Sequence, residues 1–200
     1  VSRRMLQQSG TNKEFALFYL ALGCYELGSI QQALRHAQLL HQMNPRLLSV
    51  HLNLGCIHDA MGHEGMAIRE YKKELALNPD CDEARYNLGT LFLERRAWKK
   101  ACIYLEACYS HAYLTDTVVM KLAFCLDKRG KTSEEIRLYR HYLRGHPKDA
   151  WCMSNLGAAL MDAGRDREAL RYLKQAKTLS PKTGSIKRNM ARVNKVLGLK

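Results

Sequence analysis

The sequence has few residues that interrupt helices, because only four of its 200 residues are proline. It also lacks long apolar runs: no stretch of eighteen apolar residues occurs, so no segment is expected to span a membrane. Motifs of common catalytic and metal sites are missing too, including a Gly-rich phosphate loop, G-x-S-x-G and any C-x-x-C pair. We therefore expect no enzymatic activity, no cofactor and no metal site.

The few prolines are regularly spaced, at intervals of 34, 68 and 34 residues: Pro45, Pro79, Pro147 and Pro181. Glycines keep the same step, each 17 residues before one of those prolines: Gly28, Gly62, Gly130 and Gly164. Alanines follow the period as well: Ala33, Ala67, Ala101 and Ala169. A fixed period of this length is typical of a helical repeat array.

Within each repeat, the apolar residues predict two helices joined by a turn. Apolar positions three and four apart precede the glycine and recur after it. Glycine adopts the left-handed turn conformation without steric cost, and proline ends the second helix because it cannot continue the hydrogen-bond ladder. One helical hairpin cannot bury its apolar face alone, so the hairpins are expected to stack.

The chain resembles the tetratricopeptide repeat (TPR) family. The second repeat reads Asn53-Leu54-Gly55, then Gly62, Ala67, Tyr71 and Pro79, and the fifth reads Asn155-Leu156-Gly157, Gly164, Ala169, Ala176 and Pro181. The resemblance implies an all-α fold, a right-handed superhelix of antiparallel helix pairs. Five full repeats are predicted at residues 14–47, 48–81, 82–115, 116–149 and 150–183.

Two regions flank these repeats. Residues 1–13 are interpreted as the remnant of a preceding repeat, because Thr11-Asn12-Lys13-Glu14 has the pattern of a capping box that starts a new helix. Residues 184–200 are predicted to form a capping helix. Its inner stripe consists of Ile186, Met190, Val193 and Leu197.

Three positions depart from the family pattern. His58 stands where the family favours Tyr, and we interpret it as a half-buried neutral imidazole. The third repeat has Arg96 in place of the turn glycine and Tyr113 in place of proline. A non-glycine residue in a left-handed turn costs about 1–2 kcal/mol, so the middle of the array is expected to be its least regular point.

Seven cysteines occur without metal-ligand spacing. Several lie at core positions of the predicted helices, where a free thiol behaves as a small hydrophobe. We interpret them as reduced structural thiols, which predicts a cytoplasmic location, with peripheral attachment to a membrane as an alternative.

Charge is distributed unevenly along the chain. The formal net charge is +13, with +3 in residues 1–100 and +10 in residues 101–200. The basic residues lie on second helices and on the predicted cap: Arg137, Arg140, Arg144, Arg167, Arg171, Lys174, Lys177, Lys187, Arg188, Arg192 and Lys195. The residues from Arg171 onward form a predicted basic face, which could attract an acidic protein, an anionic membrane surface or nucleic acid, or could only be solvated.

The resemblance also implies a binding surface. In this family, four positions of each first helix line the concave groove. The most informative of these here are Phe15, Phe18, Leu22, Tyr25, Leu52, Cys56, Tyr86, Thr90, Met120, Phe124, Trp151 and Met161. None is Lys or Arg, which disfavours a clamp for a C-terminal carboxylate. The groove is expected to be apolar and weakly acidic.

These features predict a non-catalytic scaffold that binds a peptide or amphipathic helix in its groove. One alternative is a homo-oligomeric scaffold that coats an acidic assembly or membrane through its basic convex face, as magnetosome-type scaffolds do. Another is an RNA-associated adaptor, although no stacking platform of aromatic residues is evident. No small-molecule substrate is expected.

Overall fold

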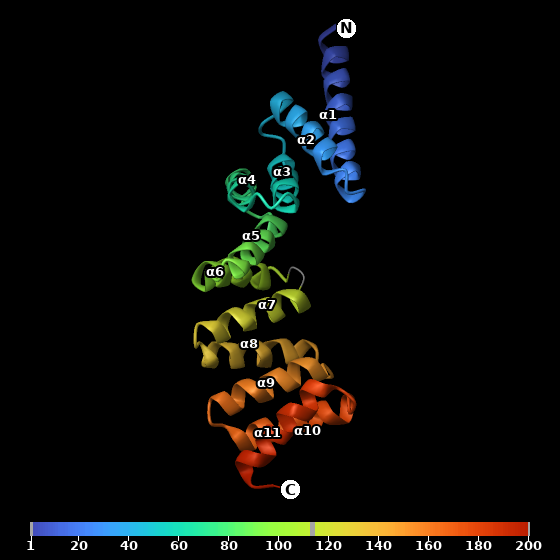
Figure 1. The fold of residues 1–200 in the computed structure, drawn as a ribbon. Helices are drawn as coiled ribbons and strands as arrows, with labels where there is room; N and C mark the ends of the chain where they lie inside the picture. Colours follow the sequence, from blue (N-terminus) through green and yellow to red (C-terminus); the bar gives the residue numbers. More distant parts are fainter. Residues whose placement is uncertain (1, 113–114, 200) are drawn as a thin grey trace. The chain divides into compact units, whose positions relative to one another are not determined.

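The computed structural model describes residues 2–112 and 115–199, with side chains from residue 12 onward, and these residues form helices and short turns without a strand. The helices are α1 (Ser2–Glu26), α2 (Ile30–Met43), α3 (Val50–Ala60), α4 (Glu64–Leu77), α5 (Asp82–Glu94), α6 (Trp98–Ser110), α7 (Thr115–Lys128), α8 (Thr132–Gly145), α9 (Ala150–Asp162), α10 (Asp166–Leu179) and α11 (Gly184–Leu197) (Figure 1). Among the described helices, none is long and apolar enough to cross a bilayer.

The chain forms two compact units, Val1–Arg95 and Arg96–Lys200, which are called the N-terminal and C-terminal units below. Within each unit, helices adjacent in sequence pack together: α1 on α2 and α3 on α4 in the first, α9 on both α8 and α10 in the second. Figure 1 shows α7, α8 and α9 of the C-terminal unit as successive layers, with α10 and α11 beyond α9.

The periodic glycines form the turns that the sequence predicts. Gly28, Gly62, Gly130 and Gly164 have φ angles between +65° and +73°, where a side chain would be strained. Gly157 has a different role: a Cβ there would lie 2.7 Å from Leu173 Cγ, so the absence of a side chain lets α9 and α10 approach closely.

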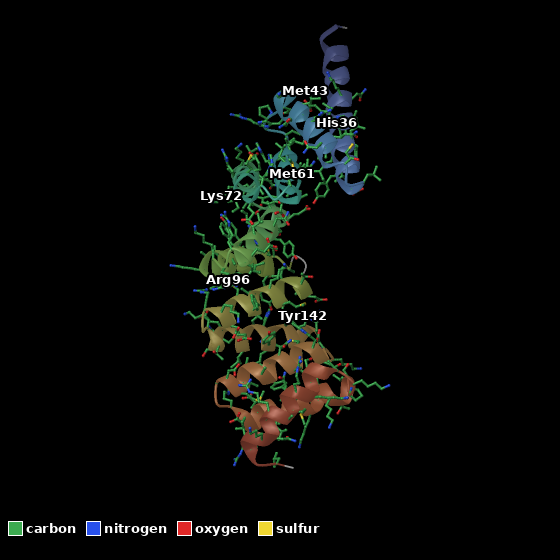
Figure 2. The ribbon with its side chains drawn as sticks, viewed as in Figure 1. His36, Met43, Met61, Lys72, Arg96 and Tyr142 are labelled. Atoms are coloured by element: carbon green, nitrogen blue, oxygen red, sulfur yellow. The ribbon has the colours of Figure 1, made fainter. Side chains whose placement is uncertain are left out.

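Arg96 adopts the left-handed conformation expected at the unusual turn, with a φ of +55°. The boundary between the two compact units falls at this residue (Figure 2). Tyr113, the other departure in the third repeat, lies outside the described residues. Ala112, just before it, also has a positive φ, of +57°.

The predicted helix start at the capping box is wrong. Helix α1 runs without interruption from Ser2 through Thr11 and Glu14 to Glu26, and Figure 1 shows its first half extending past α2. No proline stops helix propagation in residues 1–13, and each further residue adds a hydrogen bond once a helix has formed. A capping box shortens a helix only where the preceding chain turns away.

The leucines at this position of the second, third and fifth repeats occupy the core, as their spacing predicts. Leu54, Leu88 and Leu156 are 5%, 0% and 0% exposed. The alanines of the second helices are buried as well: Ala33, Ala67, Ala101 and Ala169. In α11, Ile186 and Val193 are buried against the C-terminal unit, while Met190 packs beside Ile186 and Met153.

A buried carboxylate caps helix α3. Ser49 precedes this helix in a left-handed conformation and makes no side-chain cap. Glu74 of α4, fully buried, instead accepts hydrogen bonds from the Ser49 and Leu52 backbone N–H groups at 3.0 and 3.2 Å. A negative charge at a helix N-terminus satisfies otherwise unpaired donors and complements the helix dipole.

Candidate functional site

The first helices of the N-terminal unit bring several predicted groove residues together. Leu22 and Tyr25 of α1 line a small cavity of about 90 Å³ with Cys56 of α3. Asn53 of α3 and Glu83 of α5 complete its wall. Three successive first helices, α1, α3 and α5, therefore contribute to one small cavity.

Cys56 lies at the centre of a polar contact network in this site. The Tyr71 hydroxyl donates to its sulfur at 3.5 Å, and Asn87 Nδ2 donates at 3.6 Å. Burial raises the pKa of the Cys56 thiol, and the charges of Glu83 and Asp59 raise it further, although the Tyr71 hydrogen bond acts in the opposite sense. The thiol is therefore protonated at neutral pH and serves as a contact group, not as a nucleophile.

Carboxylates give the site an acidic margin. Partial burial raises the pKa of Asp59, and the neighbouring charges of Glu94 and Glu64 raise it further. Burial raises the pKa of the Tyr25 hydroxyl, with added effects of Cys56 and Asp59. The carboxylates of Asp59, Glu64 and Glu94 therefore lie close enough to interact, and Asp59 also interacts with Tyr25 of the cavity wall.

An apolar patch lies at the middle of α1, N-terminal to Leu22 and Tyr25. Phe15 is 63% exposed and stacks on Tyr19 with ring centroids 6.3 Å apart, while Phe18 meets Tyr19 edge-on at 5.6 Å. These rings line a cavity of about 190 Å³ together with Leu48. Phe15 and Phe18 therefore contact a different cavity from Leu22 and Tyr25.

Two predicted groove residues are not available for binding. Leu52 and Met161 are each only 7% exposed, so both belong to the packed interior. Leu52 lies in the first turn of α3, at the backbone that the Glu74 carboxylate covers. Met161 lies near the end of α9, and α11 packs on this helix. Asn189 of α11 donates to the Ser154 hydroxyl at 3.0 Å, so the cap covers part of the last first-helix surface.

The remaining predicted groove residues keep partial or full exposure. Tyr86 and Thr90 of α5 are half-buried. In the C-terminal unit, Met120, Phe124 and Trp151 are 50%, 48% and 40% exposed. Phe124 meets Trp98 edge-on at 5.8 Å and carries the Lys128 ammonium 5.1 Å above its ring, so its orientation is fixed by neighbours.

Sequence reasoning missed the asparagines of this surface. Asn53, Asn87 and Asn155 occupy the same repeat position, 34 and 68 residues apart. Asn53 lines the cavity, and its Nδ2 atom is buried without a hydrogen-bond partner among the described residues. The recurrence of the Asn-Leu-Gly triplet could have identified these asparagines. We interpreted only its leucine and glycine.

The predicted basic face is exposed to solvent at every position: Arg171, Lys174, Lys177, Lys187, Arg188, Arg192 and Lys195. Arg192 pairs with Asp162 at 2.5 Å. The other six make no ion pair with the described residues. These charges are therefore free to contact a partner or solvent.

His58 of α3 is half-buried. Burial lowers the pKa of His58, which agrees with its interpretation as a half-buried neutral imidazole. Within the described part of the chain, no cluster of His, Cys, Asp and Glu side chains could hold a metal ion, and the seven cysteines are free thiols.

Comparisons with known proteins agree with this architecture. A family model described as tetratricopeptide repeat matches residues 152–186. The chain is 28% identical over 123 residues to the TPR repeat-containing protein BH2049 of Halalkalibacterium halodurans, which covers 60% of this chain and 54% of that protein. It is 23% identical over 181 residues to the BBSome complex member BBS4 of Bos taurus, which covers 90% of this chain and 35% of that protein. The chain thus spans about half and about a third of these relatives.

Solved structures share the fold at low identity. MamA has a TM-score of 0.73 at 21% identity, covering 86% of this chain and 94% of MamA. YrrB, described as a TPR protein with an unusual peptide-binding site, has a TM-score of 0.74 at 18% identity, covering 92% of this chain and 95% of YrrB.

The fold is therefore the all-α TPR superhelix. The family model over residues 152–186, the TPR neighbours and the helices are consistent with a tetratricopeptide repeat protein, the family that the residue spacing resembles. This family supports a role as a protein-interaction scaffold, and such proteins are typically non-catalytic.

Proposed function

We propose that this chain is a non-catalytic interaction scaffold whose N-terminal unit binds a peptide segment across the inner faces of α1, α3 and α5. The observation that carries the proposal is the concave site in which Leu22, Tyr25 and Cys56 meet Asn53 and Glu83. Apolar contacts there would take up apolar anchors of the segment.

The asparagines supply the hydrogen-bond donors and acceptors that an apolar groove lacks. A primary amide offers both donors and an acceptor, which match the alternating N–H and C=O groups of a peptide backbone. Asn53 has an unpartnered Nδ2, and Asn87 makes only a long contact with the weak acceptor Cys56. A peptide carbonyl would be a stronger partner for each.

The carboxylates near the cavity favour a ligand with positive charge. Glu83 borders the cavity, and the nearby charge of Glu94 adds to the burial that raises the pKa of Asp59. A cationic side chain on the ligand would relieve this repulsion. The proposed ligand is therefore an amphipathic segment that combines apolar anchors with Lys or Arg.

Peptide-display selection against the purified chain tests this proposal. Selected peptides should be enriched in apolar residues together with Lys or Arg, and should bind a Leu22→Ser/Glu83→Lys variant at least about tenfold more weakly, because apolar and charge contacts are both lost. Leu27→Ser is the matched control, since Leu27 is 85% exposed and does not line the cavity. Equal binding to all three proteins would contradict the proposal. Light scattering of the same samples would reveal the self-assembling alternative as a growth in mass without peptide.

A further inference from the structure

A second concave surface lies in the C-terminal unit, on the second helices. Helices α8 and α10 both pack on α9, and the groove between them encloses about 760 Å³. Its lining combines arginines of α8 with Tyr172 and Gln175 of α10. Met153 of α9 forms part of the floor. The repeat pattern placed these arginines on the convex side but did not predict a groove there.

The arginines form a row along one wall. Arg137, Arg140 and Arg144 are spaced three and four residues apart, so they share one helix face over about 10 Å. Arg140 pairs with Glu168 of α10, which also accepts from Arg165 at 2.5 Å. Arg137 and Arg144 are exposed and have no ion-pair partner within the described part of the chain. Two of the three positive charges in the row are therefore uncompensated.

The floor of the groove is apolar and fixed. Met153 is buried, and Leu143 and Tyr172 pack with it in the core cluster that also contains Ile186. A ligand would therefore meet a preformed surface, which reduces the conformational entropy lost on binding. Arginine and tyrosine beside an apolar floor are residue types that recur at energetically important interface positions.

We propose that this groove binds an acidic amphipathic helix of a partner protein. Carboxylates at helical spacing i, i+3 and i+7 would face the arginine row, and guanidinium groups bind carboxylates with well-defined geometry. Apolar side chains on the adjacent helix face would contact Met153 and Tyr172. The opposite wall is uncharged where Gln175 and Tyr172 lie, which matches a ligand with charge on one side only. A nucleic acid, with phosphates on both strands, would leave that wall unmatched.

The direct test uses a defined probe: a fluorescein-labelled helical peptide about four turns long, with Glu at i, i+3 and i+7 and Leu on the adjacent face. Controls are a scrambled peptide of the same composition and a version with Lys in place of Glu. Anisotropy titration of the full chain should show binding of the first peptide only, with affinity that falls as salt rises.

Matched protein variants locate the site. Arg137→Glu/Arg144→Glu should weaken peptide binding at least about tenfold, whereas Arg171→Glu/Lys174→Glu, an identical change in net charge outside the groove, should weaken it less than about threefold. Arg137→Gln/Arg144→Gln should act in the same direction and serves if the reversal disturbs folding, which circular dichroism would detect.

Several results would overturn the proposal. Equal losses in the two reversal pairs would mean that the peptide senses only the general positive field. Equal binding of the scrambled peptide would mean that the helical spacing of the carboxylates plays no part in recognition. Absence of peptide binding would mean that the groove does not recognise an acidic amphipathic helix. The same holds if a DNA duplex or phosphatidylserine vesicles bind in an Arg137- and Arg144-dependent manner while the peptide does not.

Discussion

At the residue scale, the fold places ionisable groups in settings that change their protonation. Burial raises the pKa of Glu135 in α8 to about 7, and the charges of Asp127 and Asp162 contribute to this rise. Burial also raises the pKa of the Cys125 and Cys152 thiols to about 12, which keeps both protonated. The three shifts are caused mainly by burial in the C-terminal unit.

Glu135 predicts a pH-dependent gain of stability on substitution. The folded state retains its proton up to about pH 7, whereas the unfolded state releases it near 4.5, so stability from this group falls as pH rises between those values. Glu135→Gln should match the wild type near pH 4 and exceed it by about 1–2 kcal/mol above pH 7, after allowance for solvent screening. Urea unfolding at both pH values measures the difference.

Glu134→Gln is the matched control for that prediction. Glu134 neighbours Glu135 but pairs with Lys131 at 3.2 Å and is partly exposed. Its substitution should bring no stabilisation at high pH. A gain confined to Glu134→Gln, or none at Glu135, would contradict the electrostatic reasoning.

At the element scale, helix ends are supported by residues from other helices. Glu74 of α4 binds the first backbone N–H groups of α3, where Ser49 leaves them without a side-chain cap. Asn189 of α11 bonds Ser154 of α9, which fixes the cap helix on the last repeat. Such contacts join sequence segments more than twenty residues apart, and the Glu74 contact holds α3, one of the helices of the proposed peptide site.

Glu74→Gln should destabilise the protein by about 1–3 kcal/mol, because the amide retains one acceptor and turns a donor toward a backbone N–H. Thermal or urea unfolding measures the loss, and hydrogen exchange should become faster in the first turn of α3. Glu26→Gln is the control: this exposed residue ends α1, where a carboxylate opposes the helix dipole, so its removal should be neutral or slightly stabilising. Similar losses for both substitutions would refute the capping role of Glu74.

Sequence periodicity predicts the turns and the buried positions of the helices well, but it predicts poorly which residues are exposed at a binding surface. The glycine turns and the buried leucines Leu54, Leu88 and Leu156 follow from the 34-residue step, because equivalent positions of these repeats pack in equivalent surroundings. The continuity of α1 could not be predicted, since a capping box leaves open whether the chain turns. Leu52 and Met161 were misassigned because their burial depends on Glu74 and on packing against α11, which lie outside the repeat consensus. The arginine row was visible in sequence, but its apolar floor comes from α9.

At the scale of the whole molecule, the two units carry surfaces of opposite character. The N-terminal unit offers an apolar site with carboxylates beside it, and the C-terminal unit offers a groove with an arginine wall. The net charges of the two halves of the sequence, +3 and +10, follow the same division. If both proposals hold, one scaffold would bind a basic segment through its N-terminal unit and an acidic segment through its C-terminal unit.

NMR can locate the peptide site on the first helices of the N-terminal unit residue by residue. A peptide obtained by display selection would be titrated into the isotope-labelled full chain. We expect chemical-shift changes at backbone amides on the inner faces of α1, α3 and α5 and at the side-chain amides of Asn53 and Asn87, while the amides of α2 and α4 remain unchanged. Shifts confined to α2 and α4, with the asparagine side chains unaffected, would contradict it.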